Sequence, residues 1–282
     1  MKTIGLVYNA EKSETFELVK KIDKHLQVNN IKTITCKVGI ESSEWDKLNN
    51  KLDLVIILGG DGTLLNTGRA LSSRDIPIFG INMGHLGFLT EGKNADAIEL
   101  TDYLLNNKYT IDERAMLEVT IANSKSHSNY MCALNDVVIS RGTSRKMTHL
   151  KLNVDNNPVA DYVADGLIIC TPTGSTAYAL SAGGAIMEPS IEGIQIVPIC
   201  AHSLTSRPHI VSDKREITIT FNKPHEGTIL QLDGQETITL ESEAKVKIVR
   251  AKHNAKLIRL KCEENNFYWR IRHKFHFGQT VS

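Results

Sequence analysis

The chain of 282 residues is long enough for two domains, or for one large domain, with a sizeable hydrophobic core. Its 33 lysines and arginines nearly balance 32 aspartates and glutamates, and the formal net charge of +1 argues against a protein-wide surface for nucleic acid or for an acidic membrane. Five scattered cysteines without a Cys-x-x-Cys pair favour reduced thiols and a cytoplasmic location over disulfides or a zinc site. We expect no signal peptide and no membrane span, because no apolar run approaches about 18 residues.

The first third of the sequence alternates strand and helix patterns. A helix capped by Ser13 carries Leu18, Val19, Ile22 and Leu26 at a spacing that places them on one face. A second helix is expected over residues 63–71, and strands are expected over residues 4–8, 31–38, 54–58 and 77–81. This alternation predicts a doubly wound parallel sheet, in which ligands bind beyond the carboxyl ends of the strands.

A glycine-rich loop follows the apolar strand of residues 55–58. Gly59, Gly60 and Gly62 allow the backbone to turn tightly and to bring amide groups close to an anionic oxygen. Asp61 adds a negative charge among them, which suggests a carboxylate that holds a divalent cation or accepts a proton. The alternative is a strand-to-helix turn in which Asp61 forms an Asx turn. Three glycines around an acid favour the phosphate site.

Two common nucleotide-binding fingerprints are excluded by spacing. A Gly-x-Gly-x-x-Gly motif starting at Gly60 would need glycine at Leu65, and the chain contains no Gly-x-x-x-x-Gly-Lys-Ser/Thr. A second glycine-rich segment, residues 80–89, also leaves a strand end. Phe88 within it either offers a ring to a base or packs in the core, and a helix capped by Asn94 is expected after it.

After about residue 108 the pattern changes to short strands separated by turns such as residues 155–158 and 233–234. The expected strands are residues 117–121, 137–140, 150–154, 167–170, 194–199, 217–221, 228–232, 246–249 and 257–260. We therefore expect an α/β domain over residues 1–108, a β-rich domain over residues 109–262, and a tail over residues 263–282 that packs back on the first domain. The aromatic and basic residues 267–277 of this tail indicate a closing strand or helix rather than a nucleic-acid strip.

Two polar segments interrupt the β-rich part. Residues 165–184 suggest a strand, a hydroxyl-rich turn, and a helix that ends at Gly183-Gly184, with Thr173, Ser175 and Thr176 as caps. The alternative is a capped structural helix without a ligand. Asn135 and Asp136 stand in an otherwise apolar strand, which indicates either hydrogen bonds to ligand hydroxyls or an Asx bulge.

These motifs together resemble the NAD kinase family. The resemblance is carried by residues 59–63, 80–82 with 86–89, 135–136 and 171–178, in that order along the chain. It implies a Rossmann-like amino-terminal domain with a parallel sheet and a β-rich, sandwich-like carboxyl-terminal domain. It also implies transfer of the γ-phosphoryl group of ATP to the 2′-hydroxyl of the adenosine ribose of NAD, giving NADP.

The resemblance implies roles for particular residues. Asp61 would accept the proton of the ribose hydroxyl, and Gly59, Gly60, Gly62 and Thr63 would bind the ATP phosphates with a divalent cation, expected to be Mg²⁺. No protein ligand for that cation is assigned. The NAD-binding residues would be Asp61, Gly62, Phe88, Asn135, Asp136, Lys146, Asp165, Thr176, Ala177, Tyr178, Ser181 and Gln235.

The chain departs from the family pattern at two positions. Many relatives carry Glu where this chain has Asp136, and many carry a basic residue where it has Val163. Lys146, with Arg145 beside it, then becomes the expected source of positive charge.

The resemblance further implies a homodimer or homotetramer acting on small molecules, without nucleic acid or membrane. Two other functions stay open. A lipid or sugar kinase would share the Gly-Gly-Asp-Gly loop, and a non-catalytic NAD(P)-binding sensor would bind the dinucleotide without turnover.

Overall fold

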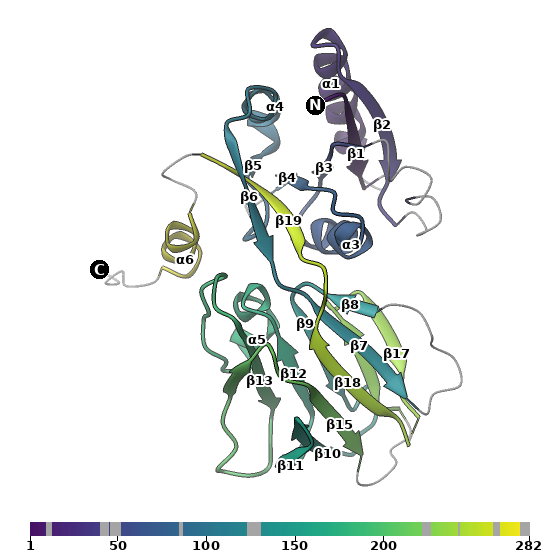
Figure 1. Cartoon of the computed structure of the whole chain (residues 1–282), viewed down its shortest axis with the longest axis vertical. Coiled ribbons are helices and arrows are strands. Elements are labelled where there is room, and N and C mark those ends of the chain that lie inside the picture. The colour runs from purple at the N-terminus through teal and green to yellow at the C-terminus, as the bar shows by residue number, and fades with distance from the viewer. Residues whose placement is uncertain are drawn as a thin grey trace. The chain divides into compact units, whose positions relative to one another are not determined.

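The computed structural model describes residues 1–9, 13–39, 45, 52–84, 87–122, 131–221, 227–241, 243–261 and 266–276. The chain forms two compact units, one made of Met1–Glu113 with Ala255–Ser282 and the other of Arg114–Asn254 (Figure 1). The boundary expected near residue 108 lies within the first unit, because β6 (Tyr109–Arg114) joins the first unit's sheet. So does β19 (Ala255–Leu260), whose residues the sequence analysis had assigned to the β-rich domain.

The sheet of the first unit has the strand order β2-β1-β3-β4-β19-β6, and the short β5 (Gly92–Lys93) pairs with β4. Parallel pairing joins β1 to β2, β1 to β3, β3 to β4 and β4 to β19. The remaining bounds are β1 (Thr3–Tyr8), β2 (Lys32–Lys37), β3 (Leu54–Leu58) and β4 (Ile78–Asn82). Every residue of β3 and β4 is buried, which explains their continuous apolar runs.

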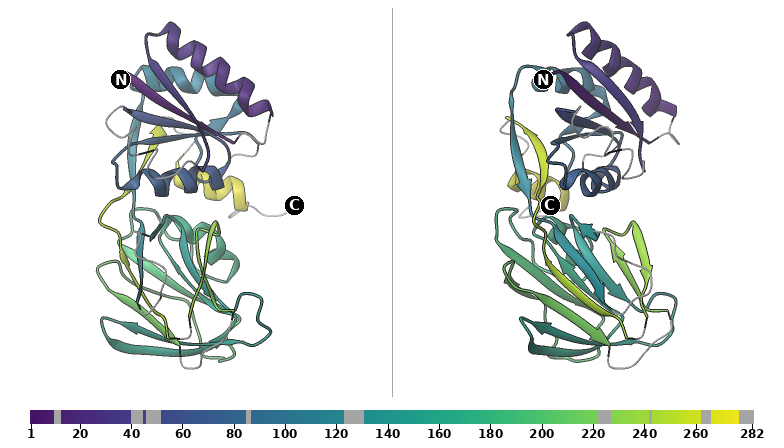
Figure 2. Two further views of the ribbon diagram at one scale, coloured as in Figure 1. Left: turned by 90° about the vertical axis from the view of Figure 1, so that its right-hand side faces the viewer. Right: turned by 45° about the vertical axis from the view of Figure 1, so that its right-hand side comes forward.

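Helices cover both faces of this sheet (Figure 2). On one face, α1 (Ser13–Val28) and α4 (Ala97–Leu105) bury Val19, Ile22 and Leu104 against Phe79 and Ile81 of β4. On the other, Gly80 of β4 faces α3 (Asp61–Ser72), since a Cβ atom on Gly80 would lie 2.6 Å from Leu64 of that helix. The expected doubly wound α/β fold is thereby confirmed.

The start of α4 differs from the expectation, and the expected cap of α1 lies outside the described residues. Asn94 opens a 3₁₀ turn (Asn94–Asp96), and α4 begins only at Ala97 without a side-chain cap. The side chain of Ser13, the expected cap of α1, lies outside the described residues, as does Leu86 of the second glycine-rich segment.

The second unit contains two six-stranded antiparallel sheets, β11-β10-β15-β18-β7-β8 and β14-β13-β12-β9-β16-β17. Their alternating inward side chains form one hydrophobic cluster, so the sheets pack as a sandwich and the expected β-rich domain is confirmed. The bounds are β7 (Leu117–Ala122), β8 (Met131–Ala133), β9 (Asp136–Ser140), β10 (Thr148–Val154), β11 (Asn157–Ala164), β12 (Gly166–Cys170), β13 (Gly193–Ile199), β14 (His209–Ser212), β15 (Ile217–Phe221), β16 (Ile229–Leu232), β17 (Glu236–Thr239) and β18 (Lys245–Arg250).

The second sheet is also covered on its outer face. Val138, Ile168 and Val197, from its three central strands, pack against Ala179 of the short helix α5 (Tyr178–Ser181). The strands β9 and β12 are therefore buried on both sides, which explains why the sequence shows apolar runs there instead of strict alternation.

The tail forms the helix α6 (Phe267–Phe275), whose cap Asn266 accepts a hydrogen bond from the amide of Trp269 at 2.9 Å. Residues 262–265 and 277–282 of the tail lie outside the described part of the chain. No helix among the described residues is long and apolar enough to cross a membrane.

Candidate active site

The glycine loop connects β3 to α3. A Cβ atom on Gly59 would lie 2.4 Å from Oγ1 of Thr63, so the loop and the first helical turn are in direct contact. The amides of Thr63 and Leu64 both donate to the carbonyl of Gly60, at 3.1 and 3.2 Å, and the helix begins at Asp61. The positive end of a helix of 12 residues therefore lies at this loop, a place that favours bound phosphate.

The Asp61 carboxylate is held by the second glycine-rich segment. Its Oδ2 accepts the amide of Phe88 at 2.8 Å, and its Oδ1 accepts the amide of Leu89 at 3.2 Å. These donors lie 27 and 28 residues away in the sequence, unlike the donor of an Asx turn, which lies two residues on. The two glycine-rich motifs thus meet at one carboxylate.

Phe88, whose amide binds Asp61, is partly exposed rather than packed in the hydrophobic core. It is half-buried, its ring centroid lies 5.2 Å from that of Phe275, and the Nζ of Lys274 lies 4.7 Å from its centroid. Burial lowers the pKa of the Lys274 ammonium, while the charge of Asp61 acts in the opposite direction. The helix α6 therefore contributes an aromatic ring and a cation beside the glycine loop.

Asn135 and Asp136 are fixed by a residue that the sequence analysis did not single out. The Asp233 carboxylate accepts the amides of Leu134, Asn135 and Asp136 at 3.0, 2.7 and 3.1 Å. On the acceptor side, the amide of Thr171 donates to the Asn135 carbonyl at 2.9 Å. The backbone of this segment is thus held at its donors and at its acceptors.

The Asp136 side chain is buried beside this anchor. Burial, and then the charge of Asp233, raise the pKa of Asp136 to about 7. A carboxyl group with this pKa carries a proton for part of the time at neutral pH, so it can donate as well as accept a hydrogen bond.

The hydroxyl-rich segment after β12 does not form the capped helix that the sequence suggested. It is a 3₁₀ turn (Thr173–Thr176) followed by the four-residue α5, and neither has a side-chain cap. Ser175 Oγ instead donates to the carbonyl of Pro172 at 2.6 Å and accepts the amide of Met187 at 2.9 Å. A Cβ atom on Gly174 would lie 2.1 Å from the carbonyl oxygen of Asn135, so this turn lies directly against the Asn135 backbone.

The expected NAD-binding side chains of this segment line its outer side. Thr176 and Ala177 are partly exposed, and Tyr178 and Ser181 are exposed, whereas Ala179 is fully buried. Gln235, also exposed, follows Asp233 at the same end of the sheet, because the amide of Asp233 donates to the carbonyl of Asp136 at 3.0 Å. The turn that contains Gly174 and the turn that contains Asp233 thus both lie against the Asn135–Asp136 segment.

Asp165 lies at the opposite end of the β9–β12 pair. Cys170 pairs with Asp136 and Gly166 with Ser140, so these antiparallel strands separate Asp165 from Asp136 by roughly 13 Å or more. Asp165 Oδ1 accepts from Nε of Arg141 at 2.7 Å. The structure therefore offers Arg141, which the sequence analysis missed, as a cation at Asp165, while Lys146 is exposed and has no ion-pair partner among the described residues.

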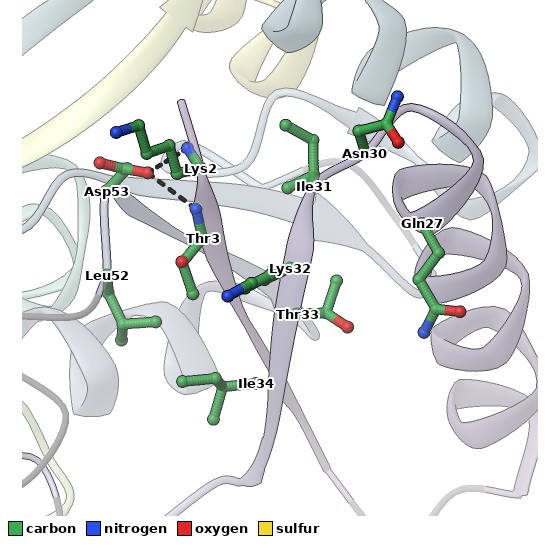
Figure 3. Close-up of a pocket in the computed structure, with 10 residues that line it drawn as sticks. All are labelled: Lys2, Thr3, Gln27, Asn30, Ile31, Lys32, Thr33, Ile34, Leu52 and Asp53. Atoms are coloured by element: carbon green, nitrogen blue, oxygen red, sulfur yellow. Dashed lines mark hydrogen bonds between the residues drawn. The ribbon is translucent and has the colours of Figure 1, made fainter.

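A hollow of about 880 Å³ lies at the starts of β1 and β2 (Figure 3). These starts are at the opposite end of the first sheet from Asp61, which follows the end of β3. The hollow is lined by the starts of β1 and β2 and by Asp53, whose carboxylate accepts the amides of Lys2 and of Thr3, the latter at 2.8 Å. These bonds lower the pKa of Asp53. None of the expected site residues lines this hollow.

Asp61 is the carboxylate at the glycine loop, and no group of three or more His, Cys, Asp or Glu side chains in the described residues could hold a metal ion. One carboxylate fits Mg²⁺, which commonly binds through one or two carboxylates, substrate phosphates and water.

Both units match family models. The model for the ATP-NAD kinase N-terminal domain matches residues 11–109, and the model for the ATP-NAD kinase C-terminal domain matches residues 134–260. The fold and the glycine loop are those of a two-unit kinase, a phosphotransferase. The chain belongs to the NAD kinase family, as the sequence resemblance indicated.

Curated relatives match along nearly the full length. The chain is 36% identical to a NAD kinase of Thermoanaerobacter sp. over 281 residues, which cover 97% of this chain and 99% of the relative. It is 33% identical to a NAD kinase of Natranaerobius thermophilus over 288 residues, with 100% of both chains covered.

Solved structures match as well. A NAD kinase from Archaeoglobus fulgidus in complex with ATP gives a TM-score of 0.76 at 27% identity, covering 96% of this chain and 98% of that one. Yeast NADH kinase complexed with NADH gives a TM-score of 0.86 at 23% identity, covering 100% of this chain and 89% of that one, and this likeness shows the fold alone.

Proposed function

We propose that this enzyme transfers the γ-phosphoryl group of ATP to the 2′-hydroxyl of the adenosine ribose of NAD, giving NADP. The observation that carries the proposal is the Asp61 carboxylate, which lies at the first turn of α3 and accepts the amides of Phe88 and Leu89. Membership of the NAD kinase family supports this choice of substrates.

Asp61 acts as the proton acceptor. A ribose hydroxyl that attacks phosphorus loses its proton as the new bond forms, and a fixed carboxylate accepts it. Two amide bonds occupy two of the roughly four lone-pair positions of the carboxylate, so positions for the ribose hydroxyl are left. The same bonds fix the direction in which those positions point.

The glycine loop binds the triphosphate. Gly59, Gly60, Gly62 and Thr63 surround the start of α3, and a Cβ atom on Gly60 would meet no atom within 4 Å, so there is room for a ligand at this loop. Asp61 is the carboxylate that, with the phosphates and water, would hold Mg²⁺, and the ion would neutralise part of the phosphate charge. Alignment of the hydroxyl with the phosphate supplies much of the rate.

The second unit binds NAD. Asn135 and Asp136 bind ribose hydroxyls, and Thr176, Ala177, Tyr178, Ser181 and Gln235 line the dinucleotide site. Asp165 binds near the nicotinamide end of NAD, and Arg141 or Lys146 supplies the positive charge beside it.

The protein acts in the cytoplasm as a homodimer or homotetramer. Cys170 and Cys200 are free thiols, which suits a reducing compartment, and Cys262 lies outside the described residues. Gel filtration with light scattering tests the assembly.

The deciding experiment is NADP formation by the purified protein from NAD, ATP and Mg²⁺, read with an NADP-specific dehydrogenase. Asp61→Asn should lower kcat by about 10²–10⁴-fold, because a positioned base contributes that much. Asp96→Asn, which changes an exposed aspartate of the same unit, should leave the rate unchanged. Tight NAD binding by calorimetry without NADP formation would instead favour a sensor.

A further inference from the structure

The backbone of the segment from Gly87 to Glu91 forms hydrogen bonds on two sides. On one side, the amides of Phe88 and Leu89 hold Asp61. On the other, Nη1 of Arg270, a residue of α6, donates to the carbonyls of Gly87, Phe88 and Thr90 at 3.3, 2.8 and 2.6 Å. The peptide groups that orient Asp61 are therefore held from behind by one guanidinium group.

Glu91 holds that guanidinium in place. Its Oε1 accepts Nη2 of Arg270 at 2.6 Å and Nη1 of Arg259 at 2.5 Å, and its Oε2 accepts the amide of Leu260 at 2.9 Å. Arg259 also donates to the Leu89 carbonyl at 3.0 Å. The side chains of Arg270 and Glu91 are only 3% and 1% exposed. A buried ion pair whose polar groups are hydrogen-bonded keeps one geometry. A group that left its partner would stay buried, with no water molecule to replace the lost hydrogen bond.

The chemistry of arginine suits this place. A planar guanidinium directs several N–H groups along fixed lines, whereas the lysine ammonium places three donors on one atom. Among the described bonds, Nη2 of Arg270 donates to Glu91, and the two N–H groups of Nη1 are shared among three carbonyls. Burial and the neighbouring Arg259 lower the pKa of Arg270 to about 10, so the group stays charged at neutral pH.

We propose that Arg270 is a positioning residue for the reaction, which acts through the Gly87–Glu91 backbone to fix the Asp61 carboxylate. The proposal rests on the proposed role of Asp61 as proton acceptor. It predicts that a change at this buried residue of the carboxyl-terminal helix affects kcat.

The test compares Arg270→Lys with Arg272→Lys. Both residues are arginines of α6, but Arg272 is exposed and makes no described bond. Arg270→Lys keeps the charge opposite Glu91, so the variant should fold even where Arg270→Ala does not, and a thermal melt checks this. Arg270→Lys should lower kcat by about 10–100-fold with KM for NAD and ATP changed by less than about threefold, because a displaced base affects the chemical step.

A double-mutant cycle separates positioning from general loosening. If Arg270 acts through Asp61, Arg270→Lys should lower kcat by less than about threefold when Asp61 is already Asn. An equal loss in both backgrounds would overturn the proposal, and so would a kcat for Arg270→Lys within about twofold of that of Arg272→Lys. The proposed function is judged separately, by NADP formation in the wild type and its loss in Asp61→Asn alone.

Discussion

Gly87 contacts Asp61 so closely that a Cβ atom at residue 87 would lie 1.8 Å from Oδ1 of the carboxylate. No real side chain tolerates this distance, so the identity of residue 87 determines where the carboxylate lies. The backbone of Gly87 is itself bonded, since its amide donates to Oγ1 of Thr90 at 3.0 Å. The glycine is therefore required by the neighbouring acid and not by a left-handed backbone conformation.

Gly87→Ala should displace Asp61 and lower kcat by about 100-fold, because a shift of about 1 Å at a reacting group costs that much. The matched control is Gly84→Ala, since a Cβ atom there would meet nothing closer than 3.8 Å. Steady-state NADP formation measures both variants. A Gly87→Ala enzyme with the kcat of the control would show that Asp61 has no such restriction.

Asp136 should make stability depend on pH. The carboxyl has a pKa of about 7 in the folded protein against an ordinary value of 3.8, so the folded state binds the extra proton between these values. Its stabilising contribution is therefore fully present below about pH 4 and is lost as the pH rises through about 7.

Asp136→Asn removes this titration. The free energy of unfolding of the variant relative to wild type should rise with pH by a few kcal/mol between about pH 4 and about pH 7. Denaturant unfolding at several pH values measures it. A constant difference across this range would contradict the raised pKa.

Asp233→Asn should destabilise the second unit by about 1–3 kcal/mol, because an amide presents one oxygen and an NH₂ group to three amide donors. It should also raise KM for NAD, since Asn135 and Asp136 lose their anchor. Asp161→Asn, at an exposed position of β11, is the control and should change stability by less than about 0.5 kcal/mol. Equal stability of the two variants would show that the Asp233 bonds are dispensable.

Arg141→Met should raise KM for NAD more than Lys146→Met does. Arg141 forms a charge-assisted hydrogen bond with Asp165, whereas Lys146 has no described ion pair. We expect a rise of about tenfold for Arg141→Met, which corresponds to one such bond. Initial rates at varied NAD concentration measure KM. A larger rise in KM for Lys146→Met than for Arg141→Met would instead make Lys146 the cation at Asp165.

Local sequence patterns predicted most of the fold. The apolar runs became buried strands, and the glycines around Asp61 became the turn before α3. β11 was missed because the polar Asn157 and Pro158 hide a strand that pairs with β10, with a register shift between Leu152 and Asn153. The expected helix after β12 was too long, because hydroxyl groups that bond to nearby carbonyls do not cap a helix.

The residues that support the site could not be found in this way. Asp233 lies 97 or more residues from the amides it binds, and Arg270 lies 179 residues from Glu91. No local pattern marks such pairs, because a buried arginine in a basic helix has the same sequence signal as an exposed one. Only Arg270, among the arginines of α6, is buried.

The late position of β19 in the sequence has a consequence for synthesis on the ribosome. The sandwich is contiguous in Arg114–Asn254, whereas the first unit lacks one of its central strands until residues 255–260 have emerged. Until then Ile78 at the start of β4 lacks its partner Leu257, and Glu91 lacks the partners Arg259 and Arg270. The second unit, in the middle of the nascent chain, is thus fully synthesised before the first unit has all its strands. The carboxyl-terminal residues complete the unit that carries Asp61.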